Sequence, residues 1–185
     1  MGELTLITGG ARSGKSAFAE SLAVRSERTV TYIATLEPLD EEMRDRIARH
    51  RAQRPASWRT IEATSDLAAA ASEAADDDTL LLDCIAVWTS NRLLALHDEA
   101  PTPAVLTTLE DTLALDVAVL LDVVATREGP TIIVSNEVGD GLVPPYALGR
   151  AYRDLLGRVN QQVSRAAQQA YLVVAGRPVL LPPPF

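Results

Sequence analysis

The sequence predicts an α/β fold in which helices flank a mainly parallel β-sheet. Short apolar runs of strand length alternate along the whole chain with longer segments of helical character, which is the pattern of such a sheet. The last two apolar runs are joined only by a short turn at Gly176 and Arg177, so they should form an antiparallel hairpin at one edge. The 185 residues, of which 47% are apolar, suit one domain spanning residues 1–185.

Each element is expected from its own local pattern. The run from Leu4 to Thr8 is apolar and ends in glycines, as a buried parallel strand does, and a helix should follow over residues 15–23. A helix over residues 40–53 has Asp40 as its N-cap, acids in its first turn and arginines near its end. The other expected strands span residues 29–34, 58–61, 79–83, 131–135, 171–174 and 179–181, and the other helices span 66–75, 85–96, 104–126 and 146–169, with a polar loop over 97–103.

Composition and charge argue against several classes of protein. A net charge of −8 disfavours a nucleic-acid-binding protein or a binder of anionic membranes, because both need an extended basic surface. No apolar run reaches the roughly 18 residues of a membrane span. The single cysteine, Cys84, excludes an intramolecular disulfide and a multi-cysteine zinc site. The N-terminus has no signal-peptide pattern, so we expect a cytoplasmic protein.

A phosphate-binding loop follows the first expected strand. The segment matches the Walker A pattern G-x-x-x-x-G-K-[ST], in which backbone N–H groups face the phosphates and the next helix points its N-terminus at them. Lys15, the only lysine beside 16 arginines, should reach the β- and γ-phosphates of a nucleoside triphosphate, and Ser16 should bind Mg²⁺. The loop consists of Gly9, Gly10, Ala11, Arg12, Ser13, Gly14, Lys15 and Ser16.

Further polar residues stand where the other expected strands end. In open α/β sheets, ligands bind outside the carboxyl ends of the strands. Asp83 ends an apolar strand, which is the setting of a Walker B carboxylate that holds Mg²⁺ through water. The same side chain could cap the next helix, and the two roles are compatible. Asn136 and Glu137 follow another strand and are candidates for contacts with a ligand or a second subunit, with a capped turn as the alternative.

The expected helix over residues 40–53 carries one of the two histidines. His50 continues the apolar face of this helix, which should point at the protein body. Five arginines against three acids between Glu41 and Arg54 give the segment an excess of positive charge that suits a polyanionic ligand. Neighbouring cations and burial both favour a neutral, nucleophilic imidazole. From spacing alone, a histidine on a solvated basic helix remains the alternative, and His97, in a polar loop, should be exposed.

These motifs together resemble the bifunctional adenosylcobinamide kinase/adenosylcobinamide-phosphate guanylyltransferase family of cobalamin biosynthesis. The phosphate-binding loop alone is generic, whereas Arg-Ile-x-x-His-Arg-x-x-Arg-Pro (46–55) together with Ser-Asn-Glu-Val-Gly (135–139) is much more specific. The sequence departs from the family at its end, where Arg177 and a Pro-Pro-Pro-Phe tail replace a short basic tail. The matching segments span residues 6–16, 32–35, 46–55, 58–62, 81–84, 134–139 and 157–161.

The resemblance implies a RecA-like P-loop NTPase fold, a homotrimer and a corrinoid substrate, adenosylcobinamide and then its phosphate. It implies phosphorylation by ATP or GTP, then transfer of GMP from GTP, with Mg²⁺ as cofactor. His50 matches the family histidine that becomes covalently guanylylated, so His50 and Lys15 are the expected catalytic residues. Ser16 and Asp83 are the expected metal-binding residues. Beyond the loop, the expected nucleotide-binding residues are Ala34, Thr35, Leu36, Arg51, Ala52, Gln53, Arg54, Glu62 and Asp83.

Three other functions are weighed against this one. A GTP-dependent switch usually reads guanine with an Asn-Lys-x-Asp motif, which is impossible here because Lys15 is the only lysine. A plain P-loop small-molecule kinase would not need His50, and no label from an α-phosphate should stay on it. A DNA-dependent RecA-like ATPase would need basic DNA-facing loops, which this acidic chain does not show.

Overall fold

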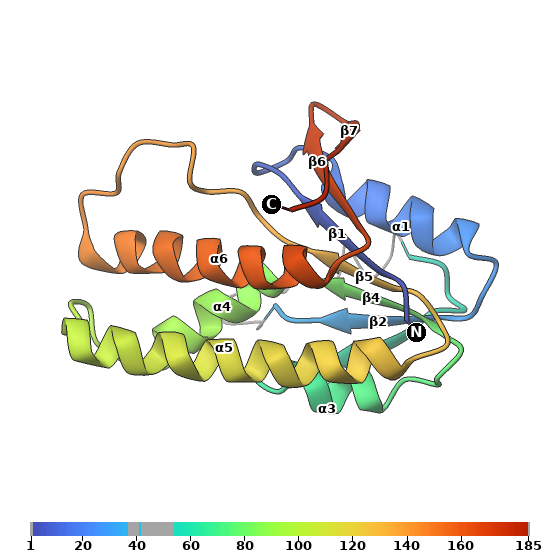
Figure 1. Cartoon of the computed structure of the whole chain (residues 1–185), viewed down its shortest axis with the longest axis horizontal. Coiled ribbons are helices and arrows are strands. Elements are labelled where there is room, and N and C mark those ends of the chain that lie inside the picture. Colours follow the sequence, from blue (N-terminus) through green and yellow to red (C-terminus); the bar gives the residue numbers. More distant parts are fainter. Residues whose placement is uncertain (1, 37–40, 42–53, 185) are drawn as a thin grey trace.

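The computed structural model of the chain describes residues 2–36, 41 and 54–184, and the expected helix over 40–53 therefore lies almost entirely outside the described residues (Figure 1). Seven strands form one sheet in the order β3-β2-β4-β5-β1-β6-β7. The strands are β1 (Leu4–Thr8), β2 (Val30–Ala34), β3 (Arg59–Glu62), β4 (Thr79–Asp83), β5 (Thr131–Val134), β6 (Gln169–Val174) and β7 (Arg177–Leu180).

Every neighbouring pair of strands is parallel except β6 and β7, which form an antiparallel hairpin. The predicted α/β fold, with a mostly parallel sheet and a C-terminal hairpin, is confirmed. Helix α1 covers one face of the sheet, and the other described helices gather on the opposite side (Figure 1). The helices are α1 (Lys15–Arg25), α3 (Leu67–Ser72), α4 (Ile85–Leu94), α5 (Pro103–Thr126) and α6 (Ala147–Ala166).

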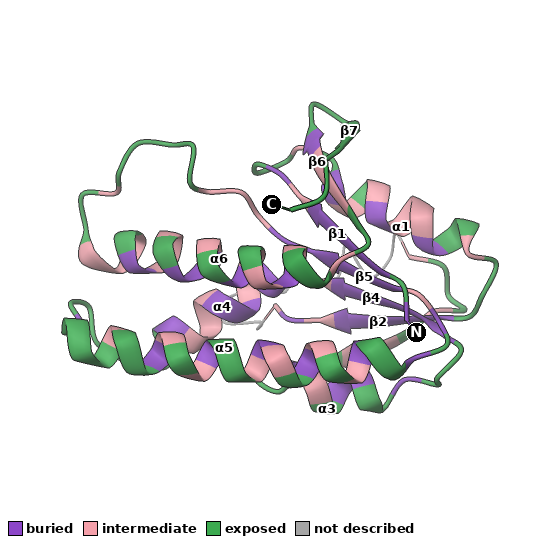
Figure 2. Ribbon diagram, in the orientation of Figure 1, coloured by how far each residue is buried: buried purple, intermediate pink, exposed green. Residues whose placement is uncertain are grey.

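The central strands are buried on both faces, which explains their unbroken apolar runs (Figure 2). Alternate residues of each strand face opposite sides of the sheet, so each strand contributes side chains to a hydrophobic core on either face. Leu4 and Leu6 pack with the helices α3, α4, α5 and α6, whereas Ile7 packs with Ala19 and Ala23 of α1. These two layers fix the sheet between the helices and leave its strand ends open to carry a site.

Element boundaries differ from the expectations by a few residues. Two helices end three residues before the expected position: α3 ends at Ser72 instead of residue 75, and α6 ends at Ala166 instead of residue 169. Gln169 instead begins β6, because it pairs with Thr5 of the central strand β1. A local helical pattern cannot anticipate that pairing, since it depends on a strand more than 160 residues away. Among the described residues, no helix is long and apolar enough to cross a membrane.

Candidate active site

The carboxyl ends of four neighbouring strands, β2, β4, β5 and β1, lie side by side at one edge of the sheet. Their register aligns the last residues across this edge: Ala34 pairs with Asp83, Asp83 with Val134, and Val134 with Ile7. The segments that leave these strands therefore begin at the same level. The predicted gathering of strand-end residues is confirmed for the described part of the chain.

The phosphate-binding loop connects β1 to α1 and has the backbone geometry that its glycines allow. Gly14 has a φ of 98° and Gly9 a φ of 154°, and both values are poorly accessible to other residues. Arg12 also lies in the left-handed region, with a φ of 55°. The loop closes through a 3.3 Å hydrogen bond from the Ser13 N–H to the Gly10 carbonyl. Helix α1 then starts at Lys15 with no acidic residue in its first turn, so its positive N-terminal end faces the loop.

Lys15 folds back over the loop that precedes it. Its Nζ donates a 2.9 Å hydrogen bond to the Gly10 carbonyl, and only 9% of the residue is exposed. Ser16 follows in the first turn of α1 and is half-buried. The ammonium group therefore lies over the backbone of the loop, where the lysine of a Walker A motif is expected.

Two carboxylates face this region from different elements. Asp83 is at the end of β4, and Glu20 lies on α1, one turn beyond Ser16 and on the same helical face. Partial burial raises the pKa of Glu20, the negative charge of Asp83 raises it further, and the guanidinium of Arg54 opposes both. This combination of a hydroxyl and carboxylate oxygens suits Mg²⁺, which takes most of its other ligands from water and phosphate.

Tyr32 connects these charges to Arg54. The guanidinium carbon of Arg54 lies 3.3 Å from the centroid of the Tyr32 ring, and the negative charge of Asp83 acts on the Tyr32 hydroxyl. Burial is the main cause that raises the pKa of Tyr32, and Asp83 adds to it, so the phenol stays protonated and can donate. No role for Tyr32 is predicted from the sequence. Its place two residues before Ala34, on the same face of β2, is the signal that could have found it.

Thr35 directly follows β2 and is fully buried. Its hydroxyl donates to the Cys84 carbonyl at 2.8 Å and accepts from the Cys84 N–H at 3.0 Å. Asn91 of α4 donates to the Thr35 carbonyl at 2.9 Å. The side chain of Thr35 thus fixes the peptide that follows Asp83. Cys84 and Asn91 help to hold this part of the site in place, and no such role is predicted for them from the sequence.

The loop after β5 is held by α6. Ser135 is fully buried and donates a 2.5 Å hydrogen bond to Oδ1 of Asn160, whose Nδ2 donates to the Asn136 carbonyl at 3.0 Å. The Glu137 N–H donates to the Gly9 carbonyl at 3.0 Å, so this loop also holds the start of the phosphate-binding loop. The Glu137 carboxylate accepts a 2.5 Å hydrogen bond from the Gly139 N–H. This contact is that of a capped turn, which was the alternative to a ligand contact for this residue.

The remaining predicted residues fall into two groups. Glu62 is the last residue of β3 and pairs with Ala34 of β2, so it lies at the carboxyl ends of the strands, as the phosphate-binding loop does. Because β3 is an outermost strand of the sheet, Glu62 lies on the periphery of this region. Leu36 follows Thr35 and is half-buried. His97 is exposed, as predicted. The other predicted residues lie outside the described part of the chain: His50, Arg51, Ala52 and Gln53.

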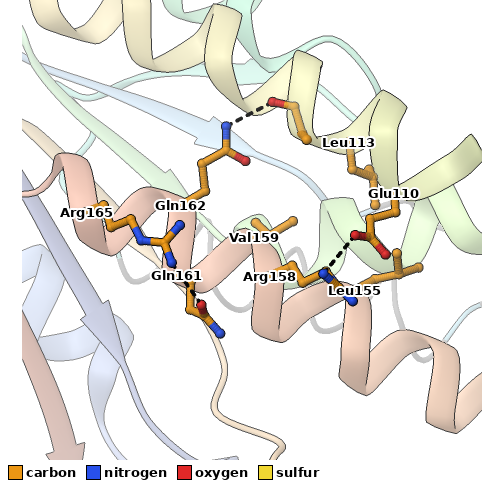
Figure 3. Close-up of a pocket in the computed structure, with 9 residues that line it drawn as sticks. Glu110, Leu113, Leu155, Arg158, Val159, Gln161, Gln162 and Arg165 are labelled. Carbon is orange, nitrogen blue, oxygen red and sulfur yellow. Dashed lines mark hydrogen bonds and ion pairs between the residues drawn. The ribbon is translucent and has the colours of Figure 1, made fainter. Parts of the chain in front are cut away.

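A separate groove of about 300 Å³ lies between α5 and α6 (Figure 3). An ion pair of 3.0 Å between Arg158 and Glu110 bridges the two helices there, and Gln162 donates to the Ala114 carbonyl at 2.9 Å. None of its lining residues belongs to the phosphate-binding loop or to the strand ends. We therefore assign the nucleotide site to the strand ends and not to this groove.

Comparison with known proteins agrees with this geometry. The family model described as cobinamide kinase / cobinamide phosphate guanyltransferase matches residues 5–181. The bifunctional adenosylcobalamin biosynthesis protein CobU of Salmonella typhimurium is 41% identical over 175 residues, covering 94% of this chain and 96% of that protein. The bifunctional adenosylcobalamin biosynthesis protein CobP of Pseudomonas aeruginosa is 42% identical, covering 95% of each chain.

Among solved structures, the RadB recombinase aligns with a TM-score of 0.48 and 14% identity over 92% of this chain and 73% of that one, a likeness too distant to add to the assignment. The sequence relatives, in contrast, are similar from end to end. On the match over residues 5–181 and on these relatives, the chain belongs to the cobinamide kinase / cobinamide phosphate guanyltransferase family.

Proposed function

We propose that this chain assembles the nucleotide loop of cobalamin in two reactions, both in one domain spanning residues 1–185. It first phosphorylates adenosylcobinamide with ATP or GTP, and then transfers GMP from GTP to the product, giving adenosylcobinamide-GDP. The observation that carries the proposal is the Walker A loop, with Lys15 closed over it, within a chain that matches this family almost end to end.

In the first reaction, the hydroxyl oxygen of the aminopropanol arm attacks the γ-phosphorus. The bond from the γ-phosphorus to its bridging oxygen breaks, the nucleoside diphosphate leaves, and the hydroxyl proton is released. Lys15 and the N–H groups of the loop would stabilise the charge that develops on the phosphate oxygens. Ser16 and Asp83 would hold Mg²⁺, with Glu20 beside them, and the ion would supply further neutralisation of that charge.

In the second reaction, a ring nitrogen of His50 attacks the α-phosphorus of GTP and pyrophosphate leaves. A phosphate oxygen of the corrinoid then attacks the same phosphorus, the P–N bond breaks, and the imidazole is regenerated. Arg54 and Glu62 would contact the guanine nucleotide during this transfer, together with the residues around them. These roles rest on the family resemblance, and Arg54 is supported further by its stacking on Tyr32.

Labelling with α-³²P GTP tests the second reaction. The full chain should acquire a label that is lost in acid and retained in alkali, as a phosphoramidate is. His50→Asn should abolish the label, and His97→Asn, which changes the exposed second histidine, should leave it unchanged. Label retained in His50→Asn, with the same acid lability, would remove His50 from this role.

A kinase without nucleotidyl transfer is the alternative, and comparing γ-³²P GTP with α-³²P GTP separates it from the proposal. Under the alternative, label passes from the γ-position to cobinamide but none from the α-position stays on the protein. Lys15→Ala should slow the kinase step by about 100-fold or more, the scale expected when a preorganised charge-stabilising group is removed.

A homotrimer and a cytoplasmic location are the remaining parts of the proposal. Sedimentation of the purified chain tests the homotrimer.

A further inference from the structure

The β6–β7 hairpin touches the phosphate-binding loop near both of its ends. The Gly176 N–H, at the tip of the hairpin, donates a 2.7 Å hydrogen bond to the Ser13 carbonyl. A Cβ atom placed on Gly14 would lie 3.2 Å from the Gly176 Cα, and one placed on Gly9 would lie 2.5 Å from the Val173 carbonyl oxygen. The hairpin therefore packs directly against the glycine backbone of the loop.

The tip of the hairpin is a two-residue turn of the type I′ class. Val174 and Arg177 pair across it, and the two residues between them, Ala175 and Gly176, have φ values of 50° and 76°. Positive φ at both positions favours Asn-Gly, so alanine at the first position is an unfavourable choice. A tight turn of this class holds the Gly176 N–H in one direction, toward the Ser13 carbonyl.

The contact with Ser13 sets the orientation of one peptide plane. Because a trans peptide is planar, its carbonyl and its N–H point in opposite directions. When the Ser13 carbonyl is bound to the hairpin, the Gly14 N–H must point away from the hairpin. Gly14 directly precedes α1, whose N-terminus faces the loop, and the Gly14 N–H is one of the donors that a Walker A loop offers to phosphate.

We propose that the β6–β7 hairpin is a positioning element of the phosphate-binding loop, and that Gly176 is its positioning residue. By holding the Ser13–Gly14 peptide in one orientation, the hairpin presents an N–H donor to the β- and γ-phosphates before the nucleotide arrives. The inference rests on the proposed nucleotide-binding function and extends the site to a segment outside the Walker motifs.

Substitutions in the turn test this role without touching a nucleotide contact. A Cβ atom at residue 176 would meet no other atom within 4 Å, so Gly176→Ala acts through the positive φ, and Gly176→Val adds a β-branched side chain that strains this φ further. Ala175→Asn favours the same turn, and Val179→Thr changes an exposed residue of β7 as a matched control. GTP and GMP affinities are measured by titration, and thermal unfolding is followed for every variant.

Gly176→Val should weaken GTP binding by about five- to tenfold and Gly176→Ala by two- to threefold, while GMP, which lacks the β- and γ-phosphates, changes by less than twofold. Ala175→Asn and Val179→Thr should bind GTP as the wild type does, and Ala175→Asn combined with Gly176→Ala should recover part of the loss. If Gly176→Val does not fold, the GTP and GMP affinities of Gly176→Ala alone test the inference.

Two results would overturn the inference: GTP affinity unchanged in the Gly176 variants, or GTP and GMP affinities reduced by the same factor in step with the melting temperature. The proposed function fails in a different way, because then the wild-type chain itself would neither bind GTP nor become labelled.

Discussion

The guanidinium carbon of Arg54 lies 3.3 Å from the centroid of the Tyr32 ring, and the charge of Asp83 acts on the hydroxyl of the same tyrosine. One side chain thus connects an arginine of the expected guanine-nucleotide segment to the carboxylate at the end of β4. Arg54 is half-buried, and a cation held over an aromatic face at such a position is stabilised by about 1–2 kcal/mol. Tyr32 therefore fixes where the positive charge of Arg54 stands relative to Asp83.

Replacing Tyr32 should separate its two contacts. Tyr32→Leu removes the ring under Arg54, and we expect the KM for GTP in guanylyl transfer to rise roughly three- to tenfold. Tyr32→Phe keeps the ring and removes only the hydroxyl on which Asp83 acts, so the KM for GTP should change by less than about twofold. Steady-state kinetics well below the melting temperature of both variants measures the difference. Equal KM values in the two variants would show that stacking does not position Arg54.

Asn160 should be important for stability because it satisfies two polar groups of the loop after β5. Without its amide, the buried Ser135 hydroxyl and the Asn136 carbonyl lose their partner. Asn160→Ala should therefore lower the free energy of unfolding by about 1–3 kcal/mol. The adjacent Gln161 is exposed and accepts a hydrogen bond from Arg165 on the same helix, so Gln161→Ala should cost less than about 0.5 kcal/mol. Urea unfolding compares the two, and similar losses would contradict the role of Asn160.

Features that depend on neighbouring residues could be predicted from the sequence. The phosphate-binding loop needs glycines, one lysine and a helix start within a few residues, and each of these is visible in the chain between Gly9 and Ser16. Asp83 could be found in the same way, because it ends an apolar run. The short link at Gly176 sufficed to predict the antiparallel hairpin, which is confirmed.

Contacts between distant parts of the chain could not be predicted in this way. Nothing near Tyr32 indicates that Arg54 stacks on its ring, and nothing near Ser13 indicates that Gly176 binds its carbonyl. These contacts follow from the strand order, in which β1 lies between β5 and β6 and brings the hairpin beside the loop. Local periodicity carries no information about that order. The catalytic assignment of His50 stays a prediction that rests on the family resemblance.

Cys84 should resist thiol reagents in the native protein. Burial is the main cause that raises the pKa of its thiol from 9.0 to about 12, and Asp83 adds to this effect. The thiolate is the reactive form, so labelling by a disulfide reagent at pH 8 should be at least about 100-fold slower in the native than in the unfolded chain. The folded pKa lies above the unfolded one, so this contribution to stability is complete below pH 9 and is lost as the pH rises toward 12.

The single cysteine makes the labelling experiment quantitative. In denaturant one thiol per chain should react, which serves as the control for reagent and protein concentration. Rapid labelling of the native chain at pH 8 would contradict the burial of the Cys84 thiol. A Cys84→Ala variant should lose less stability between pH 9 and pH 12 than the wild type does, and denaturant unfolding at both pH values measures this.

Arg127 should stabilise the edge of the sheet opposite the nucleotide site without affecting catalysis. Only 3% of it is exposed, and its guanidinium donates to the carbonyls of Ala71, Ala75 and Asp78 at 3.3, 2.8 and 2.9 Å. Arg127→Met removes all three of these hydrogen bonds, and the free energy of unfolding should fall by about 3–5 kcal/mol. Arg28 also donates to a carbonyl of this region, that of Asp77 at 3.0 Å, but on the exposed surface.

Arg28→Met is therefore the matched control and should cost less than about 1 kcal/mol, because water replaces the lost donor. Neither variant should change the kcat of either transfer at temperatures where the chain is folded, since both residues lie at the amino-terminal edge of β4. Chemical unfolding and steady-state kinetics on the same preparations test the two statements together. Equal losses of stability in the two variants would show that burial does not set the strength of the Arg127 contacts.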